Sequence, residues 1–209
     1  MRDERITFPT GSAARTHLGD TTRMEPDVPA IPTDRLELVS MSLPFMEACL
    51  ARDLDAAELD LGAAIPPTFP DGLDDFFRFR IADLRGDPSI RPWLGRALVL
   101  TDGDGRLVIG SAGFHSAPGP ERRVEIGYQV DPAFRRQGYA TEAVTALLAW
   151  ARREHGIRRF RAATAPGNAV SQRILAGLGF RETGRQWDEI DGEEVVFELD
   201  DPDEDGRTG

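Results

Sequence analysis

The sequence predicts a single α/β domain. Its 209 residues suit one domain with a sizeable core. Strand-like alternation and helix-like spacing follow each other along the chain, and no internal repeat or hinge separates a second domain. One strand also leads through a glycine-containing loop directly into an amphipathic helix, an arrangement typical of α/β ligand sites.

In the first half of the chain, each predicted element follows from a local signal. Alternating residues predict a strand at 35–39, and Ser42 can cap a helix that begins near Leu43 with proline in its first turn. Gly- and Pro-rich residues 61–72 are predicted to be a loop, and apolar spacing predicts a helix over 74–84. The sequence Asp-Gly-Asp-Gly is a hairpin signal between two further strands, which are expected at 97–101 and 107–114.

In the second half, a strand at 124–130 precedes a helix over 138–155, which Gly156 would end. Asn168 can cap the next helix. Three more strands are predicted at 159–164, 180–183 and 195–199.

The domain is expected to span residues 33–200. Residues 1–32 have no apolar periodicity and are interpreted as a flexible arm, or as an over-long start, since Met24 would serve as well. The acidic tail 201–209 is expected to be disordered.

Composition excludes several enzyme classes. All 25 basic residues are arginine, so there is no P-loop lysine, Schiff-base lysine or kinase-type strand lysine. One cysteine excludes a disulfide framework and a cysteine-based zinc cluster. The three histidines are far apart and none lies in a metalloprotease pattern, so no metal is expected.

The net charge of −11 is unevenly distributed. Residues 135–185 hold ten arginines and three glutamates, a local charge of +7, so the remainder carries −18. A basic segment suits a phosphorylated ligand, and an acidic remainder suits a cationic, amine-bearing substrate. Net acidity disfavours nucleic acid. No apolar run approaches a membrane span and the N-terminus has no signal-peptide core, so no membrane association and a cytoplasmic location are expected.

The loop at 135–140 has the chemistry of an anion site. A strand that feeds a glycine-containing loop and a helix N-terminus leaves free backbone N–H groups at the start of the helix. Gly138 would let the backbone approach a phosphate closely.

The pattern R-x-x-G-x-A at Arg135, Gly138 and Ala140 resembles the acetyl-CoA motif of the GNAT superfamily of N-acetyltransferases. The flanking sequences Glu-Ile-Gly-Tyr at 125–128 and Asn-Ala-Val-Ser at 168–171 are similar to the RimJ/RimL-like branch, the ribosomal-protein-alanine acetyltransferases. The resemblance implies a mixed, mostly antiparallel central sheet of about seven strands. That sheet would be splayed at the acetyl-CoA site and flanked by about four helices.

The resemblance also implies an activity, namely acetyl transfer from acetyl-CoA to a primary amine by direct attack on the thioester. The amine would belong to a protein N-terminus or a small molecule, and the protein would be a monomer or homodimer. The backbone N–H near Val130 is the candidate to polarise the thioester carbonyl. The implied cofactor-binding residues are Gln129, Val130, Arg135, Arg136, Gln137, Gly138, Tyr139, Ala140, Asn168 and Ser171.

Two catalytic residues are implied. Glu125 is the candidate base, with Asp131 as a rival that also suits the end of a strand. Ser171 is the candidate donor to the leaving thiolate, because a serine there lies near the CoA sulfur in this branch. Leu175 occupies the position where many superfamily members carry a tyrosine, so either Ser171 substitutes for it or the thiolate leaves without a dedicated acid. Asn168 is expected to contact the pantetheine arm, although its spacing equally predicts a helix cap.

One further departure concerns Arg136, at a loop position where glycine is frequent in the superfamily. The alternative function is a non-catalytic acyl-CoA-binding or sensing protein on the same fold. A nucleotide-binding regulator would need a Rossmann glycine motif after the first strand, which is absent. Substrate identity, carried by the weakly matched 40–90 region and the 186–194 hairpin, is not revealed.

Overall fold

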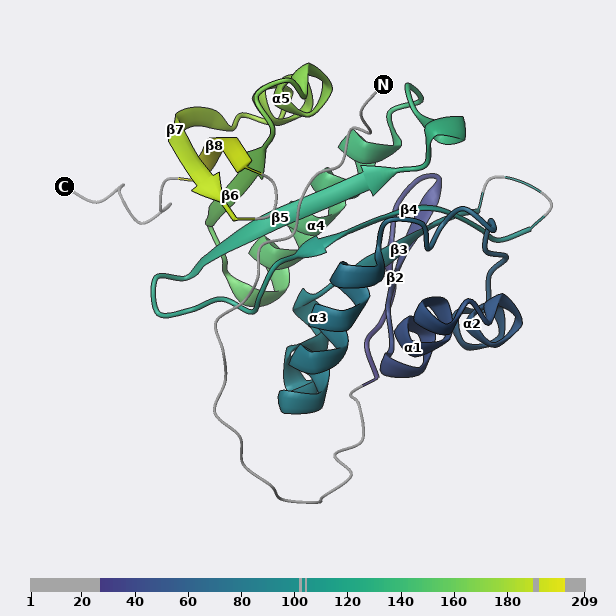
Figure 1. Ribbon diagram of the computed structural model, residues 1–209. Helices are drawn as coiled ribbons and strands as arrows, with labels where there is room; N and C mark the ends of the chain where they lie inside the picture. The colour runs from purple at the N-terminus through teal and green to yellow at the C-terminus, as the bar shows by residue number, and fades with distance from the viewer. Residues whose placement is uncertain (1–26, 102, 104, 190–191, 202–209) are drawn as a thin grey trace.

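The computed structural model describes residues 27–101, 103, 105–189 and 192–201 (Figure 1). These residues form one eight-stranded sheet with the order β1-β2-β3-β4-β5-β6-β8-β7. The strands are β1 (Ile31–Pro32), β2 (Leu36–Ser40), β3 (Arg96–Leu100), β4 (Leu107–Phe114), β5 (Arg123–Val130), β6 (Arg159–Thr164), β7 (Arg181–Asp188) and β8 (Gly192–Asp200). The α-helices are α1 (Leu43–Ala51), α2 (Leu54–Leu61), α3 (Asp74–Gly86), α4 (Tyr139–His155) and α5 (Ala169–Gly177), with 3-10 helices η1 (Pro88–Trp93) and η2 (Pro132–Phe134).

Neighbouring strands are antiparallel except for the central pair β5 and β6, which is parallel. A parallel pair needs a crossover connection, and here α4 supplies it. The predicted mixed, mostly antiparallel α/β fold is therefore confirmed. One strand more than expected is present.

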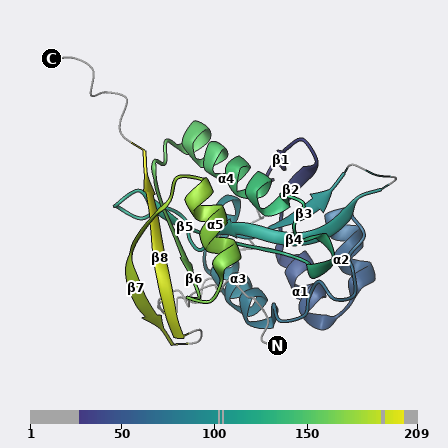
Figure 2. The ribbon, with the colours of Figure 1, turned by 90° about the horizontal axis from the view of Figure 1, so that it is seen from above.

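The helices form layers on the two faces of the sheet. Figure 2 shows α4 on one face and α1, α2 and α3 on the other. Even-numbered residues of β5, Val124, Ile126 and Tyr128, pack in one core with α4. The second core lies between α1–α3 and alternate residues of β3 and β4, such as Val99 and Val108.

Capping residues set the boundaries of α4 and the start of α1. Gly138 is the N-cap of α4, with φ of 86°, and Gly156 ends that helix with φ of 61°. Ser42 accepts a hydrogen bond from the N–H of Phe45 at 3.0 Å and begins α1, as predicted.

Some elements differ from the sequence-based expectation. Ile31–Pro32, assigned to the flexible arm, pairs with β2 as strand β1. Helix α2 was not predicted, because it is short and only Ala57 and Leu61 of its side chains are buried. Strand β7 extends from Arg181 to Asp188, beyond the expected 180–183, along a largely exposed edge.

The remainder of the arm, residues 1–26, lies outside the described part of the chain, as do residues 202–209 of the predicted tail. Asp201, the first tail residue, is held by its backbone N–H on the Arg158 carbonyl at 3.0 Å and by an ion pair with Arg152. Among the described helices, none is long and apolar enough to cross a membrane.

Candidate active site

The central feature of the site is the divergence of two neighbouring strands. β5 pairs with β6 only through Arg123, Val124 and Glu125. From Ile126 to Val130, β5 remains paired with β4 on its other side. The sheet is therefore open between β5 and β6 over the second half of β5 (Figure 1).

Backbone groups of β5 face this opening. The carbonyl of Glu125 accepts from the N–H of His115, and the N–H of Asp131 donates to the Ile109 carbonyl, both at 2.8 Å. Successive residues of a strand direct their N–H and C=O groups to opposite sides, toward one neighbouring strand and then the other. The odd-numbered residues therefore bond to β4, whereas the N–H groups of Tyr128 and Val130 point toward the opening.

A cavity of about 550 Å³ lies at the open end of the strands. It is bounded by the end of β5, the loop before α4, and the first turns of α4 and α5. Its lining residues are Tyr128, Gln129, Val130, Pro132, Phe134, Arg135, Arg136, Gly138, Tyr139, Ala140, Thr141, Asn168, Val170, Ser171 and Ile174. The structure thus brings together every predicted cofactor-binding residue except Gln137.

The loop before α4 has an unusual backbone. Arg136 has φ of 66° and Gly138 has φ of 86°, both in the left-handed region that glycine adopts without steric cost. For Arg136 this conformation is unfavourable, because its β-carbon crowds the backbone there. Arg135 folds back and its Nε donates to the Val130 carbonyl at 3.0 Å.

The start of α5 forms the opposite wall. Asn168 Oδ1 accepts from the Ser171 N–H at 3.1 Å, so the predicted cap is present. Asn168 and Ser171 are both buried. Because the cap uses the side-chain oxygen of Asn168, its amide nitrogen remains as the donor to a ligand. Leu175 is 1% exposed and belongs to the core, not to the cavity lining.

Tyr128 is a site residue that the sequence did not identify. Its hydroxyl lies 3.5 Å from the Ser171 carbonyl oxygen, and burial raises its pKa to about 12. It therefore keeps its proton at neutral pH. Nothing in the sequence indicates this contact, because 43 positions separate the two residues.

Glu125 does not line the cavity. Side chains alternate along a strand, so Glu125 lies on the sheet face opposite α4, at the point where β5 and β6 part. Its Oε2 is 3.2 Å from Arg161 Nη1 and its Oε1 is 3.6 Å from His115 Nδ1. The side chain is 16% exposed.

The environment of Glu125 shifts its pKa upward. Burial raises its pKa, and the Arg161 guanidinium partly offsets that rise. His115 supplies no compensating positive charge, because burial and then the nearby Arg80 and Arg161 lower its pKa to about 3. A carboxyl group whose pKa is raised toward neutrality is suited to accepting a proton.

The rival base, Asp131, has a structural role. Its Oδ1 accepts from the Ala133 N–H at 2.8 Å and caps η2, and its Oδ2 lies 3.4 Å from the Thr68 hydroxyl. Both oxygens are therefore engaged at the end of β5.

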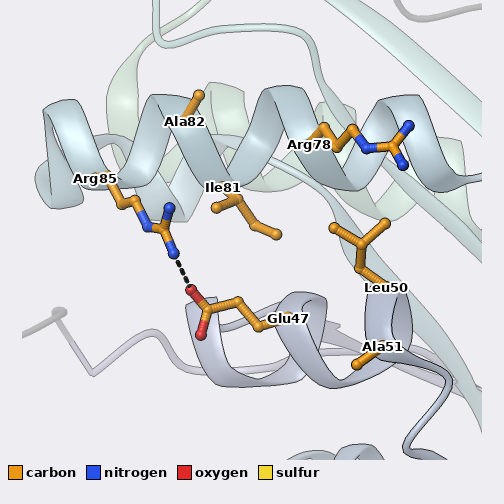
Figure 3. A pocket seen from close by; sticks show the side chains of 7 residues that line it. All are labelled: Glu47, Leu50, Ala51, Arg78, Ile81, Ala82 and Arg85. Carbon is orange, nitrogen blue, oxygen red and sulfur yellow. Dashed lines mark hydrogen bonds and ion pairs between the residues drawn. The ribbon is translucent and has the colours of Figure 1, made fainter.

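A second cavity, of about 460 Å³, lies between α1 and α3 (Figure 3). Its lining is mostly aliphatic, and its Glu47 carboxylate is held by Arg85 at 2.6 Å. Arg78 extends from the same side of α3. The residues that line this second cavity include no nucleophile and no free base, so acyl-transfer chemistry is not indicated there. Among the described residues, no group of His, Cys, Asp and Glu side chains is arranged to hold a metal ion.

A splayed parallel strand pair and a helix N-terminus preceded by a basic glycine-containing loop form a site suited to an anionic ligand. Comparison with known sequences identifies the family. The acetyltransferase (GNAT) domain matches residues 62–181, and the chain belongs to this family, as its resemblance indicated. It is therefore an acyltransferase of the N-acetyltransferase class.

The chain is also similar to individual proteins, in sequence or in fold. The Bacillus subtilis N-acetyltransferase YjdG is 29% identical over 154 residues, which cover 71% of this chain and 87% of YjdG. The ribosomal-protein-S5-alanine acetyltransferase from Vibrio fischeri shares the fold, with a TM-score of 0.55, 18% identity, and coverage of 85% of this chain and 98% of that one. The microcin C7 self-immunity acetyltransferase MccE, solved with acetyl-CoA and AMP, has a TM-score of 0.54 at 17% identity, covering 80% and 93% of the two chains.

The two roles open to Asn168 can be separated by mutation. Asn168→Ala should lower the free energy of unfolding by about 0.5–2 kcal/mol, because the α5 cap is lost. Asn168→Asp keeps an oxygen acceptor but lacks the amide donor, so its thermal unfolding should match wild type. If Asn168 also contacts a cofactor, Asn168→Asp should weaken CoA binding in calorimetry despite normal stability. Unchanged affinity in the Asp variant would limit Asn168 to capping.

Proposed function

We propose that this protein transfers an acetyl group from acetyl-CoA to a primary amine by direct attack on the thioester. The observation that carries the proposal is the convergence of the open edge of β5, the 135–140 loop and the α5 start on one cavity. A diphosphate would be held by the loop and by free N–H groups in the first turn of α4, where the helix dipole favours negative charge.

The open strand edge suits the acyl group. The N–H groups of Tyr128 and Val130 face the opening without a strand partner on that side. A donor aimed at the thioester carbonyl would stabilise the oxyanion that forms during attack. We assign this role to the Val130 N–H.

The reaction then needs one base. The acceptor ammonium loses a proton to Glu125, directly or through water, and the amine nitrogen attacks the acetyl carbon. As the new C–N bond forms, the C–S bond breaks and its electron pair remains on sulfur, while the second proton of the attacking nitrogen passes to the departing thiolate or to water. The raised pKa of Glu125 supports its role as acceptor of the proton.

The leaving thiolate needs a hydrogen-bond or proton donor. Ser171 lies in the first turn of α5, where backbone N–H groups also favour negative charge. The Tyr128 hydroxyl is a second candidate because it reaches the same turn.

The acceptor is proposed to be a protein N-terminus or a small amine. The acidic character of the chain outside residues 135–185 supports a cationic acceptor. Acceptor preference is best determined by an acetylation assay over a panel of small amines and peptides with free N-termini.

Cofactor binding can be tested directly by calorimetry with CoA. Gly138→Glu adds a side chain at a left-handed position and a like charge beside the expected diphosphate, so it should abolish binding. Gly119→Glu is the matched control, because Gly119 has open space around it and lies outside the site. Equal CoA affinity in the two variants would contradict the cofactor site. Wild-type protein that binds CoA but acetylates no amine would favour a sensing protein.

The base can be tested by its pH dependence. Glu125 must be deprotonated to act, so kcat/KM should fall as the pH drops through its pKa, above the ordinary glutamate value of 4.5. Glu125→Gln should lower kcat by roughly 10²-fold or more with little change in CoA affinity. Arg161→Gln removes the charge that lowers this pKa, so the acidic limb should move to higher pH. Arg159→Gln is the control, because Arg159 lies on the same strand but pairs with Asp200. In this variant the acidic limb of the pH profile should not move.

If the Glu125→Gln variant keeps the wild-type rate and pH profile, Glu125 is a structural strand residue. If the acidic limb of the pH profile does not move in Arg161→Gln, Arg161 does not control the pKa of the catalytic base.

The thiolate donor can be identified with two variants. Losing a hydrogen bond to a developing charge costs about 1–3 kcal/mol, so Ser171→Ala should slow turnover by about ten- to a hundredfold. The defect should shrink with an acyl donor whose thiol is more acidic, because that leaving group needs less help. Tyr128→Phe removes only the neighbouring hydroxyl. A defect in Tyr128→Phe but not in Ser171→Ala, with the same donor dependence, would transfer the role to Tyr128.

A further inference from the structure

The connection between β1 and β2 is joined to the first turn of α4 by a dense set of contacts to one carboxylate. Glu142 Oε1 accepts from the Thr33 hydroxyl at 2.6 Å and from the Arg35 backbone N–H at 2.9 Å. Its Oε2 accepts from Arg35 Nε at 2.8 Å and lies 2.6 Å from Nη2. Figure 2 shows β1 and β2 beside one end of α4. Residues more than 100 positions apart are therefore fixed to each other.

The location of this carboxylate needs an explanation. Glu142 lies in the first turn of α4, where the free N–H groups of the proposed cofactor site are found. An uncompensated carboxylate there would repel a diphosphate. Burial alone would raise the pKa of Glu142, but hydrogen bonds from Thr33 and Arg35 lower it, so the group is charged and paired.

The same guanidinium contacts the loop itself. Arg35 Nη1 donates to the Gln137 carbonyl at 3.0 Å, and the guanidinium carbon lies 4.4 Å from the centre of the Tyr139 ring. A β-carbon on Gly138 would lie 3.4 Å from Nη2. Arg35 thus contacts Gln137 and Tyr139, the two neighbours of Gly138, close to the left-handed Arg136. Such backbone conformations persist only where surrounding contacts hold them.

We propose that Arg35 is a positioning residue for cofactor binding, and that it acts through Glu142 and the Gln137 carbonyl. It neutralises the carboxylate at the α4 N-terminus and holds the 135–140 loop in its ligand-ready conformation. This role rests on the proposed use of acetyl-CoA. Arg35 is not assigned contact with the reacting atoms.

The first test compares CoA affinity in Arg35→Ala and Arg106→Ala by calorimetry. Arg106 is a matched control, because it also pairs with a carboxylate, Glu37, and donates to a carbonyl, that of Gly62 at 2.9 Å. Their side chains are similarly exposed, 36% for Arg35 and 39% for Arg106. Arg35→Ala should raise the Kd for CoA by about tenfold or more, as expected for lost charge-assisted contacts, and Arg106→Ala should not.

The kinetic signature distinguishes positioning from chemistry. The KM for acetyl-CoA should rise in Arg35→Ala while kcat stays within about twofold, as when binding common to ground and transition states is lost. With acetyl-pantetheine, which lacks the diphosphate, the variant and wild type should have equal KM. Arg35→Lys should recover only part of the affinity, because lysine keeps the charge but not the planar, two-sided contact.

A double mutant tests the role of the carboxylate. In Arg35→Ala, Glu142 is left charged beside the diphosphate, so adding Glu142→Gln should restore part of the CoA affinity. Thermal unfolding shows whether Arg35→Ala is folded. If it is not, the CoA affinities of Arg35→Lys and of Glu142→Gln are compared with that of Arg106→Ala instead.

Three results would overturn the inference. If wild type binds CoA and the Arg35 variants bind equally well, Arg35 has no positioning role, although the proposed function stands. An equal loss with acetyl-pantetheine would make the effect a general disturbance of the fold. Wild-type protein that does not bind CoA would contradict the proposed function and this inference together.

Discussion

The site depends on the point at which β5 loses its second neighbour. A backbone N–H or C=O away from water needs a partner, and a sheet normally provides one on each side of a strand. After Glu125, β5 keeps β4 but no longer pairs with β6. The N–H groups of Tyr128 and Val130 then face the opening, where a ligand can accept hydrogen bonds from them. The same opening brings the unsatisfied N–H groups of the α4 N-terminus to one end of the gap. Two sets of backbone donors therefore face one cavity, and neither set requires a special side chain.

Charge is arranged around these donors by arginine alone, since the chain has no lysine. Arginine stays charged when buried and offers several directed donors, so it can hold backbone carbonyls as well as carboxylates. Arg135 uses this property on the Val130 carbonyl, and Arg35 on the Gln137 carbonyl. The loop is thus supported from both sides by guanidinium groups that are already committed to protein atoms. A phosphate would meet backbone N–H groups that are held in place before it arrives.

The local parts of this arrangement could be predicted from sequence. The strand at 159–164, the start of α4 at Gly138 and the Asn168 cap follow from periodicity, glycine and capping chemistry, which act over a few residues. The remaining parts depend on contacts between distant segments. The Arg35–Glu142 pair and the approach of Tyr128 to Ser171 each join residues that no local pattern connects. Strand β1 pairs with a nearby segment, but it has only two residues, Ile31–Pro32, which are too few to show an alternating pattern. Helix α2 was missed for a different reason, because few of its side chains are buried and its apolar stripe is weak.

The position of Leu175 shows how one departure from the family pattern redistributes chemistry. At this position many superfamily members carry a tyrosine, but here Leu175 is buried in the core and the neighbouring Ile174 lines the cavity. Either the thiolate leaves without a dedicated acid, or a hydroxyl that already faces the cavity would assist it. Ser171 faces the cavity from α5, and Tyr128 does so from β5, with its hydroxyl against the Ser171 backbone. Because the pKa of Tyr128 is raised to about 12, this phenol is a hydrogen-bond donor rather than a ready acid. Its natural contribution would be to stabilise the thiolate as it forms, which requires a donor in place and not a complete proton transfer.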